Sequence, residues 1–218
     1  MSSSLKSCYN DDDSIEIGVD EAGRGPMFGR VYAAAVVLPK DNSFDHSEMK
    51  DSKKFTSQKK MLKVADYIKK NAICWSVAFS TEQEIDTHNI RKATHLAMHK
   101  AIKDVTTKLN LTKQNTHILV DGNDFTPFMF YENECLVAGK TTTIKQGDNK
   151  ISSIAAASIL AKIERDNYIV KLCDDEPELD NKYKLKKNKG YGTKQHLEGI
   201  QNYGISKYHR KTFGICKN

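Results

Sequence analysis

The stretch from Ile15 to Pro39, IEIGVDEAGRGPMFGRVYAAAVVLP, constrains the fold more than any other part of this chain. It holds two short apolar runs that are rich in β-branched residues and bounded by Gly and Pro, a pattern typical of strands. Between them lie Asp20 and Glu21 and then a Gly-Arg-Gly turn. Successive side chains on a strand point to opposite faces, so the two carboxylates can share a site only if the chain bends there. The glycines permit that bend and a close approach of the backbone to a ligand.

The remaining hydrophobic pattern alternates between helical and extended periods, which predicts an α/β fold. The segment after residue 151 begins with IAAASILA, an almost wholly apolar run that indicates a helix buried against a sheet. The other periods predict these elements: strands at 72–79, 117–120 and 141–144, and helices from about 56 to 70, from 82 to 109 with a break near Asn89, from 151 to 174 and from 193 to 203.

A chain of 218 residues predicts one large domain, with room for a small appendage. We expect a disordered leader over 1–14, a main domain over 15–175 and a basic helical segment over 176–218. Residues 182–218 hold ten Lys or Arg and one acid, whereas residues 1–181 hold 24 Lys or Arg and 27 acids. This asymmetry predicts a polyanionic partner, most simply nucleic acid, although a solvated charged surface is the alternative.

The sequence also argues against a membrane protein, a secreted protein and a protein held by disulfides or by Cys/His metal sites. The sequence has no apolar run of about 18 residues and no secretory signal, so we expect a cytoplasmic protein without membrane contact. Its five cysteines lack CxxC or Cys/His spacing, which indicates reduced thiols. His95 and His99 lie four residues apart, as two metal ligands could, but no acid or further histidine completes a site beside them.

Four acids share one property, because each ends an apolar run and is followed by a turn: Asp20, Glu21, Asp121 and Asp148. Ligands bind where strand ends converge in an α/β sheet. Acids gathered there repel one another unless cations neutralise them, and Mg²⁺ or Mn²⁺ takes such oxygen ligands. Two such ions serve phosphodiester cleavage. The alternative is four ordinary turn acids, since Asp is common after strands.

Six motifs in order resemble ribonuclease HII, the type 2 ribonuclease H family: GVDEAGRGP, DSKK, LVDGN, the GD before SIAAASILAKIERD, NKGYGTKQH and YHRKTFG. They run from residue 15 to residue 214, nearly the whole chain. DEAGRG and AASILAKxxRD are each quite specific. The related ribonuclease HIII differs after the acidic pair, where it lacks this Gly-Arg-Gly.

The resemblance implies a ribonuclease H-like α/β domain with a mixed five-stranded sheet flanked by helices, and a small C-terminal helical appendage. It implies an endonuclease that cleaves RNA in RNA–DNA hybrids and cleaves 5′ of single ribonucleotides embedded in duplex DNA. The products carry 3′-hydroxyl and 5′-phosphate ends, and two divalent ions, Mg²⁺ or Mn²⁺, serve the hydrolysis. Such an enzyme takes part in ribonucleotide excision during DNA replication and repair, and the compact length favours a monomer.

Residue by residue, the motifs imply three sets of functional side chains. The four acids, Asp20, Glu21, Asp121 and Asp148, match the catalytic metal ligands. Gly23, Arg24 and Gly25 match the turn that reads the ribose 2′-hydroxyl through backbone groups, and Tyr191 matches the tyrosine that stacks at the RNA–DNA junction. Lys53, Lys54, Lys162 and Arg165 lie in matching motifs and hold phosphates or brace the site.

Two rival functions compete with this interpretation. A non-catalytic nucleic-acid-binding subunit could have kept the fold, but the intact acids argue against it. A different two-metal nuclease, such as a resolvase, could share the fold, but Gly-Arg-Gly and Tyr191 address a ribose and a junction. The basic stretch with Lys182, Lys184, Lys186 and Lys187 is expected to bind phosphates.

Overall fold

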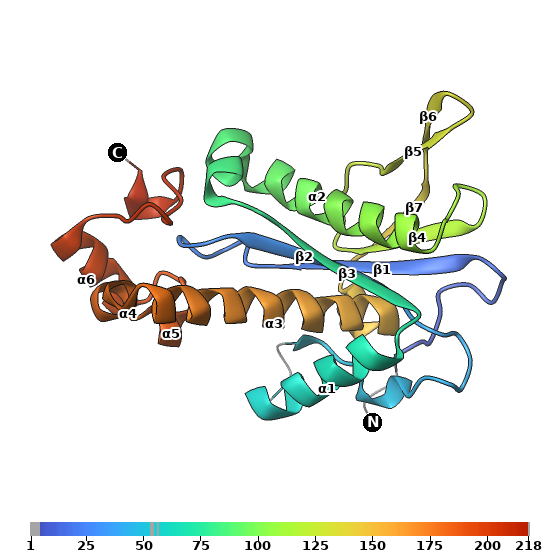
Figure 1. The fold of residues 1–218 in the computed structure, drawn as a ribbon, viewed down its shortest axis with the longest axis horizontal. Coiled ribbons are helices and arrows are strands. Elements are labelled where there is room, and N and C mark those ends of the chain that lie inside the picture. Colours follow the sequence, from blue (N-terminus) through green and yellow to red (C-terminus); the bar gives the residue numbers. More distant parts are fainter. Residues whose placement is uncertain (1–4, 53–54, 56, 218) are drawn as a thin grey trace.

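The computed structural model describes residues 5–52, 55 and 57–217, and its centre is a five-stranded sheet in the order β3-β2-β1-β4-β7 (Figure 1). The strands are β1 (Ile15–Ala22), β2 (Val31–Val37), β3 (Cys74–Ser80), β4 (Thr116–Asp121) and β7 (Lys140–Ile144). β1 pairs antiparallel with β2 and parallel with β4, and β4 pairs parallel with β7. The predicted mixed five-stranded sheet is thus confirmed.

Helices cover both faces of this sheet (Figure 1). α2 (Glu82–Lys108) packs on one face, and α1 (Gln58–Asn71) and α3 (Ser152–Asp175) pack on the other. α2 contains the predicted break, since Asn89 has φ 67°. Short 3-10 turns lie at His46–Glu48, Gly147–Asn149 and Gly214–Cys216. No helix within the described residues is both long enough and apolar enough to span a membrane.

The close packing of α3 on β1 follows from small residues. The first half of α3 is buried on every side, as its apolar sequence predicts. A Cβ added at Gly18 would lie 2.2 Å from the carbonyl carbon of Ser153, so only glycine lets the helix backbone come this near to the strand. α3 therefore lies directly over the end of β1 that carries the acidic pair.

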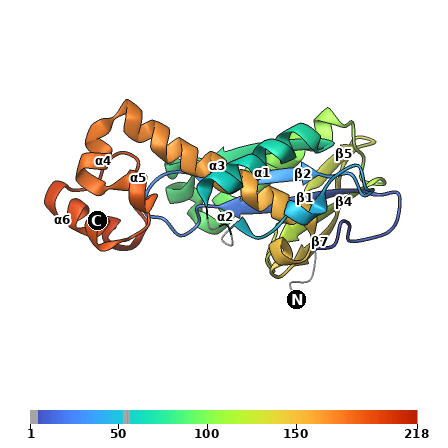
Figure 2. The ribbon, with the colours of Figure 1, turned by 90° about the horizontal axis from the view of Figure 1, so that it is seen from below.

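The C-terminal segment forms a helical unit at one end of the sheet (Figure 2). It consists of α4 (Pro177–Tyr183), α5 (Leu185–Asn188) and α6 (Lys194–Tyr203). Its buried apolar side chains, such as Leu185 and Ile200, pack with Phe28 from the β1–β2 loop and with Ile169 from α3. The same cluster therefore joins the unit to the main domain.

Two sequence expectations differ from the structure. Disorder over 1–14 does not hold for residues 5–14, because the Lys6 N–H donates to the Lys150 carbonyl and the Tyr9 N–H donates to the buried Glu16 carboxylate. A second sheet, β5 (Met129–Glu132) with β6 (Cys135–Ala138), was not predicted. Its four-residue strands are too short to give a clear period of two, and most of their side chains are exposed.

Candidate active site

The register of the parallel pair β1 and β4 brings two of the predicted acids together. Val19 pairs with Val120, so Asp20 and Asp121 follow at neighbouring positions at the carboxyl ends of adjacent strands. The Gly147 N–H donates to Asp121 Oδ1 at 2.6 Å, which places the 3-10 turn carrying Asp148 beside β4. Parallel strand ends thus converge as the sequence predicts.

A cavity of about 420 Å³ opens at these strand ends. Its walls come from β1, the Gly-Arg-Gly turn, β4, α3 and the C-terminal unit. The lining residues that the sequence predicted are Asp20, Glu21, Gly23, Arg24, Gly25, Asp121, Lys162, Arg165 and Tyr191. Asp148 is not in the lining and is buried next to it, where its Oδ1 accepts a hydrogen bond from Asn149 at 3.0 Å.

Asp20 is an acid whose charged form is disfavoured by its surroundings. Its side chain is buried, and burial raises its pKa well above the ordinary value, with the negative charges of Glu21 and Asp121 adding to the rise. Hydrogen bonds from Ser158 and from the Glu21 N–H offset only part of that effect. A cation placed among these carboxylates would favour their charged forms.

The donor set suits a hard divalent cation, since all of the converging ligands are carboxylate oxygens. Asp20, Glu21 and Asp121 are the side chains that could hold it, with Asp148 behind them. Among the described residues, no three His, Cys, Asp or Glu side chains are already arranged as a metal cage. The Glu21 carboxylate lies instead 3.4 Å from the Arg24 guanidinium.

The Gly-Arg-Gly turn presents backbone to the cavity. Gly23 has φ 94°, a left-handed conformation that favours glycine. A Cβ there would lie 3.1 Å from the Arg30 carbonyl oxygen and 3.2 Å from Arg165 Nε. A Cβ at Gly25 would lie 3.6 Å from the Tyr191 ring. The turn and the half-exposed tyrosine therefore lie side by side.

Arg165 braces this wall of the cavity. It is only 2 % exposed, and its guanidinium donates to the Lys189 carbonyl and to the Asp166 carboxylate. The guanidinium carbon lies 5.5 Å from the centre of the Tyr191 ring. Of the two roles that the sequence left open, phosphate binding and bracing, these contacts favour bracing. Lys162 is more exposed and pairs with Asp166 at 2.8 Å.

Two predicted site residues, Lys53 and Lys54, lie outside the described residues. Their neighbour Ser52 does line the cavity, and its hydroxyl lies 3.1 Å from the Ser158 hydroxyl on α3. The loop that leads to the lysine pair thus reaches the site. His95 and His99 instead contact Thr126, at 3.0 and 2.8 Å, in the segment after β4.

Sequence reasoning missed three residues at this site. Ser158 could have been found, since Ser158, Lys162 and Arg165 follow one another at spacings of four and three and share a helix face. Ser52 carries no such pattern. Arg210, which is completely buried beneath the Gly-Arg-Gly turn, sits in a basic tail where every cation looked equally exposed.

The chain is similar to one protein family along most of its length. The family model described as Ribonuclease HII matches residues 17–216. The chain is 44% identical over 207 residues to a ribonuclease HII of Parabacteroides distasonis, covering 95% of this chain and 94% of that protein. It is also 44% identical over 199 residues to a ribonuclease HII of Pelagibacter ubique, covering 91% and 95% of the two chains.

Known structures share the fold at low identity. Ribonuclease H2 from Pyrococcus horikoshii has a TM-score of 0.70 at 22% identity and covers 93% of this chain and 95% of its own. The Bst-RNase HIII structure in complex with Mn²⁺ has a TM-score of 0.63 at 14% identity and covers 87% and 70%. The match along residues 17–216 and the identity to curated relatives place this chain in the ribonuclease HII family, as a divalent-metal-dependent endoribonuclease that acts on RNA–DNA hybrids.

Proposed function

We propose that this ribonuclease also cleaves duplex DNA on the 5′ side of a single embedded ribonucleotide and leaves 3′-hydroxyl and 5′-phosphate ends. The observation that carries the proposal is the composition of one cavity wall. The carboxylates of Asp20, Glu21 and Asp121, the Gly-Arg-Gly turn and Tyr191 line the same cavity of about 420 Å³. The acids, the turn that suits a ribose and the aromatic ring are thus close enough to contact two successive nucleotides of one strand.

The Gly-Arg-Gly turn is the part suited to the ribose. A protein tells RNA from DNA by the 2′-hydroxyl, which both donates and accepts hydrogen bonds. Backbone N–H and carbonyl groups can meet it only if no side chain intervenes, and Gly23 and Gly25 supply that access. A single ribose suffices for this contact, so a long RNA strand is not required.

Tyr191 is the part suited to the junction. Its ring is 48% exposed, borders the cavity and is backed by the Arg165 guanidinium. An aromatic face held in this way packs on a sugar or base of the next nucleotide. A deoxyribose fits closely against it, whereas a second 2′-hydroxyl would meet an apolar surface.

The acids define the reacting centre. We propose that Asp20, Glu21, Asp121 and Asp148 hold two ions of Mg²⁺ or Mn²⁺. Such a pair activates a water and stabilises the leaving oxygen in phosphodiester hydrolysis. The raised pKa of Asp20, caused by burial and by its acidic neighbours, supports the proposal because it leaves that carboxylate in need of a cation. Lys162 lines the cavity, which supports a role for its ammonium group in holding a phosphate.

The proposal extends to the setting of the enzyme. We propose that the enzyme is a monomer in the cytoplasm. Its substrate fits a role in ribonucleotide excision during replication and repair. The C-terminal unit adds phosphate affinity through its excess of lysines.

Cleavage assays on three duplexes of one sequence test the proposal. The first carries one ribonucleotide in DNA, the second has one strand entirely of RNA, and the third is all DNA. We expect cleavage of the first two, with the break 5′ of the single ribonucleotide and 3′-hydroxyl and 5′-phosphate ends by mass spectrometry. Cleavage of the hybrid without cleavage of the first duplex would overturn the proposal, and so would a break 3′ of the ribonucleotide.

A further inference from the structure

The loop between β1 and β2, residues 23–30, is held from below by one side chain of the C-terminal tail, Arg210. This guanidinium donates to five backbone carbonyls of the loop. Nε donates to Gly29 at 2.7 Å, Nη1 to Pro26 at 2.7 Å and Arg24 at 3.1 Å, and Nη2 to Gly23 at 2.6 Å and Arg30 at 3.1 Å.

These contacts use the full donor capacity of the side chain. A guanidinium has five N–H donors in a fixed planar fork, and five carbonyls accept them here. Arg210 is 0% exposed, and no ion pair within the described residues includes it. Burial and the nearby Arg165 charge lower the pKa of Arg210 to about 9, so it stays charged at neutral pH. The guanidinium carbon also lies 5.1 Å from the centre of the Phe213 ring. Because a buried cation needs its hydrogen-bond partners, the five carbonyls orient Arg210, and Arg210 in turn orients the five carbonyls.

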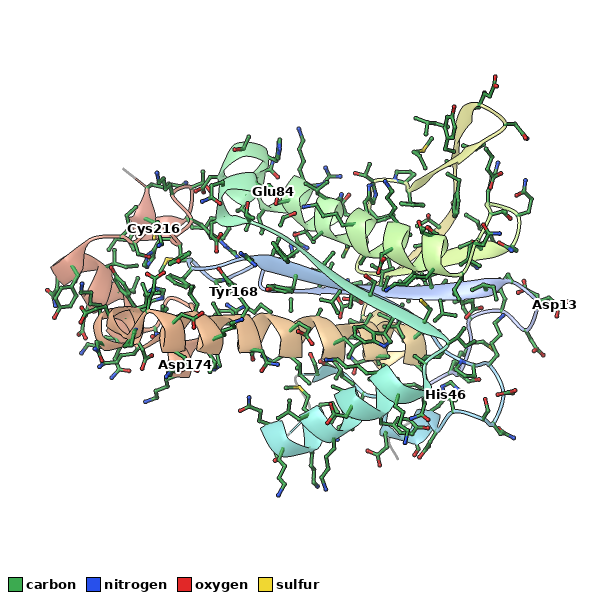
Figure 3. The ribbon with its side chains drawn as sticks, in the orientation of Figure 1. Asp13, His46, Glu84, Tyr168, Asp174 and Cys216 are labelled. Carbon is green, nitrogen blue, oxygen red and sulfur yellow. The ribbon has the colours of Figure 1, made fainter. Side chains whose placement is uncertain are left out.

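Backbone hydrogen bonds also join the loop to the C-terminal part of the chain. The Arg210 N–H donates to the Met27 carbonyl, and the Gly29 N–H donates to the Tyr208 carbonyl, both at 2.9 Å. The Met27 N–H donates to the Gly190 carbonyl at 2.9 Å, next to Tyr191. Tyr168 lies at the same end of the sheet, where it joins α3 to α2 by donating to Glu82 at 2.9 Å (Figure 3).

The carbonyl directions fix where the neighbouring N–H groups point. In a trans peptide the C=O and N–H of one unit point in opposite directions, and the described residues contain no cis peptide bond. The Gly23 and Arg24 carbonyls point toward Arg210. The N–H groups of Arg24 and Gly25 therefore point away from Arg210. Arg24 and Gly25 line the cavity, and Arg210 does not.

We propose that Arg210 is a positioning residue for ribose recognition. Its hydrogen bonds orient the carbonyls of the Gly-Arg-Gly turn toward the buried guanidinium. The N–H groups of Arg24 and Gly25 then lie at the cavity wall, where the 2′-hydroxyl oxygen of the substrate can accept their hydrogen bonds. The inference rests on the proposed function, because it assigns a cause to the selection of a ribonucleotide. Arg210 does not touch the substrate and acts only through the turn.

The test compares Arg210→Lys with the wild-type enzyme in the presence of Mg²⁺. Lysine keeps the charge but has only three donors on one atom, so it cannot hold five carbonyls. Two quantities are measured: kcat/KM on the duplex with one ribonucleotide, and the inhibition constant of the all-DNA duplex as a competitor. The second quantity reports the contacts to phosphate and deoxyribose and does not depend on a 2′-hydroxyl.

We expect Arg210→Lys to lower kcat/KM by about 10-fold, as loss of a well-placed hydrogen bond to substrate does, with the inhibition constant within about twofold of the wild-type value. Lys211→Met is the matched control, since Lys211 is the exposed neighbour and its side chain forms no hydrogen bond or ion pair with the turn in the described part of the chain. That variant removes a charge and is expected to leave the ratio of the two quantities unchanged.

The outcomes separate the possible failures. If both quantities worsen in parallel, or neither changes, Arg210 does not position the turn. Partial unfolding is recognised by a melting curve and by recovery of kcat/KM on cooling. If Arg210→Lys does not fold, Arg210→Gln, which keeps a planar two-donor group, replaces it.

If the wild-type enzyme cuts the all-RNA hybrid strand but not the single-ribonucleotide duplex, the proposed function fails and this inference fails with it. If the wild-type enzyme selects the ribonucleotide and Arg210→Lys selects it equally well, only this inference fails.

Discussion

Two groups of buried charge lie on either side of the Gly-Arg-Gly turn, and they are stabilised in different ways. On one side, Asp20 is buried beside Glu21 and Asp121, and this repulsion together with burial raises its pKa. On the other side, Arg210 is buried more completely, yet carbonyl oxygens accept all five of its hydrogen bonds. The carbonyl oxygens of the loop offset the burial of the cation, whereas the pKa of Asp20 stays raised despite its hydrogen bonds.

This difference indicates which group performs chemistry and which builds the scaffold. A buried charge that the chain itself satisfies rigidifies a loop, as Arg210 does. A buried group of like charges costs stability unless something from outside compensates it. The acids thus fit a site for a divalent cation. The arginines instead hold the backbone that forms the cavity wall beside these acids.

Neutralising one acid should give the largest effect on activity. Asp20→Asn is expected to lower turnover by about 10³-fold, the loss typical when a main transition-state contact is removed. The melting temperature without metal should not fall, because one repelling charge has gone. The half-exposed Asp104, paired with Lys108, supplies the control Asp104→Asn. Full activity of Asp20→Asn would contradict the assignment.

Removing the aromatic face should have the next largest effect. Tyr191→Ala is expected to lose about 10- to 100-fold on a duplex with one ribonucleotide and less on an all-RNA hybrid strand, since stacking is worth roughly 1–3 kcal/mol. Tyr203→Ala, at an exposed tyrosine of the same unit, is the control. Equal losses on both substrates with a lower melting temperature would instead make Tyr191 a structural residue of its turn.

Low pH should destabilise the fold around Arg210 through protonation of its neighbour His209. Burial and the adjacent His196 lower the pKa of His209 to about 4. A histidine with a lowered pKa stabilises the fold above its unfolded pKa, and this contribution is lost as the pH falls from about 6.5 toward 4. We expect about 2 kcal/mol less unfolding free energy at pH 5 than at pH 8 from this group. His209→Gln should flatten that dependence, and an unchanged pH profile would contradict the assignment.

The lysines of the C-terminal unit should show the smallest effect. Lys182 and Lys186 pair with Glu178 and Asp174, at 3.2 and 2.6 Å, whereas Lys184 and Lys187 form no ion pair within the described part of the chain. Each phosphate contact contributes a slope of roughly 0.9 to the logarithmic salt dependence of binding.

Replacing Lys184 and Lys187 by Ala should therefore flatten the salt slope more than replacing Lys182 and Lys186. Binding of an all-DNA duplex at several salt concentrations measures the slopes. Equal slopes for the wild-type enzyme and the double variants would mean that this surface is solvated and does not bind nucleic acid.

Local periodicity and the ends of apolar runs predicted the individual strands and helices and the convergence of Asp20 with Asp121, whereas the mixed five-stranded sheet was predicted from the family resemblance. The same local pattern predicted the Asn89 break. The β5–β6 hairpin escaped prediction because its outward side chains, such as Tyr131 and Leu136, are apolar and exposed, so no polar alternation marks the strands.

The arginines could not be predicted for a different reason. Nothing in the tail distinguishes Arg210 from Lys211, yet one is completely buried and the other is exposed. The difference arises from contacts with a loop about 180 residues away in the chain, as the separation of Arg210 from Gly29 shows. Burial of a cation by distant carbonyls leaves no local signal in the sequence.

Titration of the metal-free enzyme with Mn²⁺ tests the central claim, that the acids form a cation site, most directly. Binding is followed by the loss of the free Mn²⁺ signal in electron paramagnetic resonance and by the melting temperature. We expect about two ions per chain. The unfolding free energy should rise by about 2.7 kcal/mol for each bound ion at 100 times its dissociation constant. Asp20→Asn and Asp121→Asn should weaken this binding at least about tenfold, as loss of a charged ligand does. Binding of equal affinity in the wild-type enzyme and both variants would contradict the account.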